Sequence, residues 1–182
     1  MPFQRFDNSR LTAVPASDVS PRGCHESLAL VQACRLGSGP ATRPLPWQPA
    51  RIEWTFGVLH VRDLAVARRA CLLLDGCWGM EDAASTAERL RIRLAAQVAD
   101  WAWWRPLQVA DAWDAGLARS VTSLSGFHPR RATLIVVDHA VLDPSTPLVL
   151  AELEQQARSW RRAVRLVIAG GPPPAFARPV GA

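Results

Sequence analysis

The sequence contains no lysine, no tyrosine and no glycine-rich phosphate-binding motif. All 21 basic residues are therefore arginine. Without lysine the chain cannot form a G-x-x-x-x-G-K-[ST] loop, and the G-x-G-x-x-G fingerprint is missing as well. We therefore do not expect nucleotide hydrolysis by this chain alone. The exclusive use of arginine is more typical of a GC-rich genome than of a particular function.

Long apolar runs are also missing. No stretch of about 18 apolar residues occurs, so the sequence predicts no transmembrane helix. The N-terminus is polar and lacks the pattern of a signal peptide. We therefore expect a cytoplasmic protein.

The four cysteines show no C-x-x-C spacing, so no disulfide is expected. Cys24, His25 and Cys34 match no common zinc-site spacing and lack a fourth ligand. No cofactor is predicted from these residues. No nucleophile and base lie near each other in sequence, although Cys77 and His139 would meet if both lay at one sheet edge.

The chain has 182 residues, of which 49% are hydrophobic and 20% charged, and this predicts one soluble domain with a sizeable core. The net charge is +5, but the arginines are scattered along the chain. A nucleic-acid surface would need them to share a face with aromatic side chains, and the sequence does not indicate this. Nucleic-acid binding is therefore not favoured.

Two short apolar runs each end in an aspartate. Residues 70–75 read as a buried strand ending at Asp75, and residues 132–138 as a second strand ending at Asp138. Ligands bind at the carboxyl edge of open α/β sheets, so two carboxylates at that edge indicate a candidate site. The alternative is that each Asp serves a turn or a helix N-cap.

Strands alternating with helices predict a three-layer α/β fold with a mostly parallel sheet. We expect an extended or partly disordered segment over 1–45, the α/β domain over 46–171 and a disordered tail over 172–182. Further helices are predicted over 24–36, 64–69 with Asp63 as the cap, 81–104, 113–124 and 147–160. Residues 51–61 predict a strand or a hairpin with its bend near Gly57, and further strands are predicted over 106–110 and 164–169.

Several stretches together resemble the DUF58 family, whose members are von Willebrand factor A-like proteins often encoded beside MoxR-type AAA+ ATPases. The likeness covers roughly residues 43–171 in order and spacing. It is carried by Arg51-Ile52-Glu53-Trp54, residues 57–63, residues 68–75 with Met80, Val137-Asp138 and Leu142-Asp143.

In von Willebrand A domains a D-x-S-x-S loop and a distant Asp form a metal-ion-dependent adhesion site. The resemblance places Asp75 and Asp138 at these positions, but Cys77 and Gly79 replace the two serines. A neutral thiol is a poor ligand for Mg²⁺ and glycine offers no side-chain oxygen. We therefore expect a vestigial, empty site, with Mg²⁺ as the only cofactor worth testing.

The resemblance and the missing catalytic groups favour a non-catalytic interaction module, an adaptor or assembly factor that works with a MoxR-type ATPase or a client complex. The alternative is a degenerate P-loop protein of the RecA or FtsK kind, because residues 134–138 resemble a Walker B strand. The candidate partner-binding residues are Cys77, Trp78, Met80, Trp103, Trp104 and His139.

Overall fold

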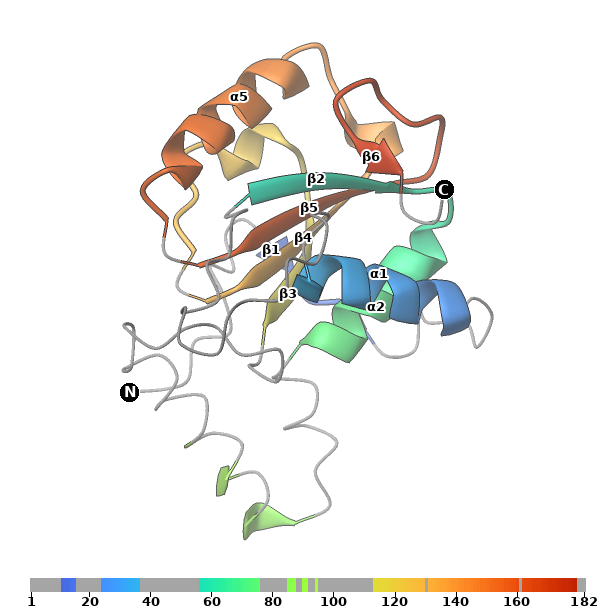
Figure 1. Cartoon of the computed structure of the whole chain (residues 1–182), viewed down its shortest axis with the longest axis vertical. Helices are drawn as coiled ribbons and strands as arrows, with labels where there is room; N and C mark the ends of the chain where they lie inside the picture. Colours follow the sequence, from blue (N-terminus) through green and yellow to red (C-terminus); the bar gives the residue numbers. More distant parts are fainter. Residues whose placement is uncertain are drawn as a thin grey trace, which may run out of the picture.

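The computed structural model of the chain describes a single sheet with helices on both faces (Figure 1). The described residues are 11–15, 24–36, 56–75, 85–87, 90–91, 94, 113–129, 131–160 and 162–179.

The described residues form a six-stranded sheet in the order β1-β3-β4-β5-β2-β6. Its centre is β4 (Thr133–Asp138) and β5 (Val164–Ala169), which pair in parallel over their whole length. Beside them lie β3 (Asp114–Ala118) and β2 (Phe56–Val61), also parallel. Two-residue strands close the sheet, β1 (Leu11–Thr12) antiparallel to β3 and β6 (Arg178–Pro179) parallel to β2. The predicted mostly parallel α/β architecture is confirmed.

Helices cover both faces of this sheet and complete three layers. Helices α1 (Cys24–Leu36) and α2 (Leu64–Leu74) pack on one face, and α5 (Thr146–Ala157) packs on the other (Figure 1). The two buried clusters follow these layers, with Leu134 and Val136 facing α1 and α2 while Ile135 and Val137 face α5. A strand buried on both faces needs a continuous apolar run, which explains the sequence of β4.

Four elements follow the sequence prediction. The helix over 24–36 is α1 and that over 147–160 is α5, while the strands over 132–138 and 164–169 are β4 and β5. Asp63 caps α2 as predicted, because its side chain accepts a hydrogen bond from the Ala65 N–H at 2.7 Å. The sequence patterns of these elements are unambiguous, because apolar spacing, caps and turn residues all indicate the same helix or strand.

The predicted strand ending at Asp75 is wrong, because residues 70–74 continue α2 to Leu74. The buried positions of this helix include Val66, Ala67, Ala70 and Leu74, a helical spacing, while Leu73 points to solvent. A short apolar run fits a buried strand and a buried helix face equally well by composition. Here the capped helix that begins at Asp63 extends through it.

The helix predicted over 113–124 is also wrong. Residues 114–118 form strand β3, and only Thr122–Leu124 make a 3₁₀ turn, η2. The strand Asp114-Ala115-Gly116-Leu117-Ala118 lacks β-branched residues, so local propensity gives no strand signal. Pairing with β4 over four residues determines its conformation.

Of the strand or hairpin predicted over 51–61, the described residues form one continuous strand, β2, without the bend expected near Gly57. Gly57 lies within the strand, and all six residues pair in parallel with β5. A von Willebrand A-like sheet would place a short antiparallel edge strand near residues 57–61 beside a strand ending at Asp75. This expectation is wrong, because residues 70–74 are helical and β2 is parallel.

Both end segments contribute to the sheet. Residues 11–12 of the segment predicted as extended add β1, and residues 178–179 of the segment predicted as a disordered tail add β6. Of the helix predicted over 81–104, the described residues 86–87, 90–91 and 94 are helical. A helix that covers the sheet would bury its apolar side chains, but Leu90 and Leu94 of this segment are both more than half exposed. The strand predicted over 106–110 lies outside the described residues.

Candidate functional site

The two aspartates proposed as one ion site lie at opposite edges of the sheet. Asp138 ends β4 and pairs with Ala169, at the carboxyl edge. Asp75 follows α2 and forms a bridge with Trp113, which immediately precedes β3 at the amino edge. The prediction that they share the carboxyl edge is therefore wrong, because Asp75 ends a helix that runs back across the sheet. The two carboxylates cannot bind one cation.

At the amino edge Asp75 ends α2. Its backbone N–H donates to the Cys71 carbonyl at 2.8 Å, and the Trp113 N–H donates to the Leu74 carbonyl at 3.3 Å. Burial raises the pKa of the Cys71 thiol, with smaller contributions from Cys34 and from Asp75. The thiol therefore stays protonated and behaves as a small apolar group.

Cys34 behaves in the same way. Burial raises the pKa of its thiol to about 12, which outweighs the opposite effect of the nearby Arg165 guanidinium. His25 is exposed on the same helix, whereas Cys34 is fully buried. The structure thus gives no support to a zinc site at these residues.

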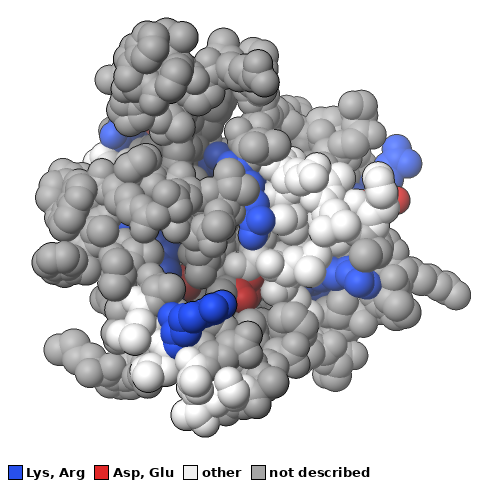
Figure 2. Space-filling view, turned by 60° about the horizontal axis from the view of Figure 1, so that its bottom comes forward, with Lys and Arg blue, Asp and Glu red and all other residues white. Residues whose placement is uncertain are grey.

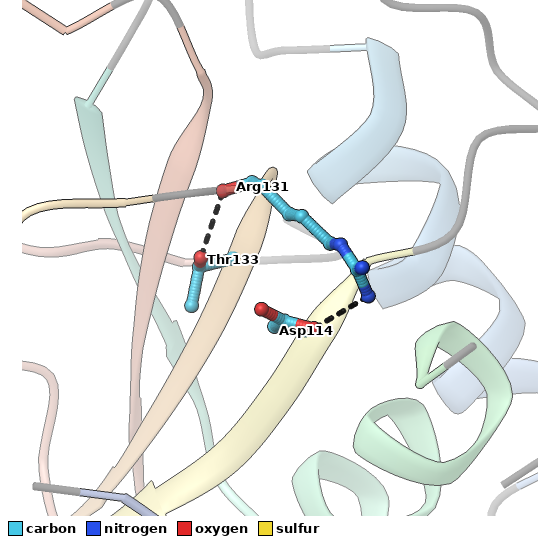
Figure 3. A network of polar contacts seen from close by, with 3 residues as sticks. All are labelled: Asp114, Arg131 and Thr133. Carbon is cyan, nitrogen blue, oxygen red and sulfur yellow. Dashed lines mark hydrogen bonds and ion pairs between the residues drawn. The ribbon is translucent and has the colours of Figure 1, made fainter. Parts of the chain in front are cut away.

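An ion pair that the sequence analysis did not anticipate joins the first residue of β3 to the segment just before β4. Arg131 Nη1 lies 3.6 Å from Asp114 Oδ1, and both side chains are largely buried. The Thr133 hydroxyl donates to the Arg131 carbonyl at 2.9 Å, which fixes the backbone before β4 (Figure 3). Asp114 was missed because it was assigned to a helix. A sequence signal for this ion pair was nevertheless present, because Arg131 is one of the two arginines that precede the second apolar run.

The described arginines do not form a continuous basic surface on the face drawn in Figure 2. They appear there as separate groups, with acidic atoms between two of them (Figure 2).

At the carboxyl edge Asp138 caps a turn. Its Oδ1 accepts a hydrogen bond from the Ala140 N–H at 2.9 Å at the start of η3 (His139–Val141). The alternative interpretation of this Asp as a cap therefore agrees with the geometry. His139 packs against Gly171, where a Cβ would lie 2.5 Å from the imidazole Cγ. Gly171 has φ +60°, a conformation that glycine adopts without strain.

His60 ties the end of β2 to the same loop. The imidazole is buried, and its Nε2 lies 3.2 Å from the Gly170 carbonyl oxygen. The Gly170 N–H in turn donates to the Val61 carbonyl at 3.0 Å. His60 and His139 thus hold the loop that follows β5.

The connection from β2 to α2 contains only Arg62 and Asp63. In α/β proteins the N-terminus of such a helix is where a phosphate would bind, because its first N–H groups have no intrahelical partner. Here the Asp63 carboxylate takes that position with its bond to Ala65. A second anion there would be repelled by the carboxylate.

The other candidate residues are only partly placed. Cys77, Trp78, Met80, Trp103 and Trp104 lie outside the described residues. A meeting of Cys77 with His139 therefore lies outside them too. Trp113 and Trp160 are both buried.

Among the residues that the structure describes, no three histidine, cysteine, aspartate or glutamate side chains gather closely enough to hold a metal ion. In the same part of the chain, no helix has the length and apolar character needed to cross a bilayer.

No family model, no curated protein and no solved structure matches the chain.

Proposed function

We propose that the chain is a non-catalytic protein-interaction module, an adaptor or regulator that works with an ATPase. The observation that carries this proposal is the connection between β2 and α2. In a nucleotide-binding α/β domain this connection is long and rich in glycine, so that backbone N–H groups can surround phosphates. Here it has two residues, and a carboxylate caps the helix.

The degenerate P-loop interpretation is favoured by the strand order. Read from β6 to β3, the parallel strands follow the order β6-β2-β5-β4-β3. This order resembles that of RecA-like cores, and Asp138 ends the strand that would carry a Walker B carboxylate. In this order β5 lies between β4 and β2, so the strand that ends at Asp138 is not adjacent to the strand that precedes α2.

The MoxR-type partner depends on the sequence resemblance alone. That resemblance implied a strand ending at Asp75 and an antiparallel strand near residues 57–61, and these are a helix end and a parallel strand. The MoxR-type adaptor and the degenerate P-loop protein nevertheless have the same proposed role. In each case the chain has no nucleotide chemistry of its own and acts on a partner that has such chemistry.

Calorimetric titration of the full chain with Mg²⁺-ATP and Mg²⁺-ADP tests the proposal. We expect no saturable heat at millimolar nucleotide, in the unaltered chain or in the matched variant Asp63→Gly. Partners crosslinked in a native lysate are then purified, and their ATPase rate is measured with and without the chain. A changed rate supports the proposal, whereas saturable micromolar nucleotide binding to the chain overturns it.

A further inference from the structure

We draw no further inference here: the strongest candidate, the outer edge of β2, which β6 covers only at Leu59 and His60, carries nothing because nothing in the described part of the structure shows what would cover the rest of that edge.

Discussion

Arg131 Nη1 lies 3.6 Å from Asp114 Oδ1, and this ion pair joins the first residue of β3 to the segment just before the neighbouring parallel strand β4. The distance is longer than that of a hydrogen bond, so this contact is an ion pair. Both groups are removed from water, so each depends on the other and on surrounding polar groups to offset its desolvation. The pair thus holds β3, a strand with weak propensity, in register with β4.

Asp114→Ala should therefore lower the free energy of unfolding by about 3 kcal/mol, because it leaves the Arg131 guanidinium buried beside an apolar side chain. Urea denaturation measures this loss. The control is Arg158→Ala at the exposed end of α5, where we expect a change within about 0.5 kcal/mol. Equal effects of the two substitutions would show that the ion pair contributes nothing to stability.

Gly170 and Gly171 offer a matched pair of substitutions. Both have positive φ, +85° and +60°, so alanine at either position incurs backbone strain of about 1 kcal/mol. At Gly170 the added Cβ meets its nearest atom at 3.9 Å, whereas at Gly171 it meets the His139 ring at 2.5 Å. Gly171→Ala should thus lower the melting temperature more than Gly170→Ala. Adding His139→Ala should remove most of the difference, and a difference that persists would contradict the steric explanation.

The carboxylate of Asp143 provides a prediction about pH. It accepts hydrogen bonds from the Ser145 N–H, the Ser145 hydroxyl and the Thr146 hydroxyl before α5. The pKa of this carboxyl is lowered below its ordinary value, and the hydrogen bond from the Ser145 hydroxyl is the main cause. A lowered folded-state pKa stabilises the fold above the unfolded-state pKa of about 4, and this contribution is lost as the pH falls through the folded value.

Asp143→Asn should consequently be less stable than the unaltered chain near neutral pH, and the difference should shrink below pH of about 4. Urea denaturation at several pH values measures it. The control is Asp138→Asn, which removes a carboxylate at another cap and so reports the general effect of such a removal on stability. A difference for Asp143→Asn that stays constant down to strong acid would contradict the assigned cause.

The sequence predicted those elements whose local and long-range signals agree. Strands β4 and β5 are continuous apolar runs, and α5 has both an apolar side and a Pro in its first turn. The prediction from sequence failed for residues 70–74 and for β3, because at these positions tertiary pairing and not the local pattern decides the structure. Both failures displaced the candidate site, since they moved Asp75 to the wrong edge and hid Asp114 in a supposed helix.

The helical assignment of residues 70–74 can itself be tested. In a helix Leu74 faces the core and Leu73 faces solvent, with exposed fractions of 3% and 42%. Leu74→Ala should cost about 2–4 kcal/mol of unfolding free energy and Leu73→Ala less than about 1 kcal/mol. A buried strand with both faces covered would give similar losses at the two positions, and that result would contradict the helix.

The separation of Asp75 and Asp138 yields the last prediction. Had they shared an ion site, each would repel the other without a cation, and replacing one would change the effect of replacing the other. Because they lie at opposite edges of the sheet, the effects of Asp75→Asn and Asp138→Asn on the free energy of unfolding should add within about 0.5 kcal/mol. Denaturant curves of both single variants and the double variant, with and without Mg²⁺, measure the coupling. A coupling well above that value, or one that appears only with Mg²⁺, would show that the two carboxylates act on a common ion and that α2 does not end where we place it.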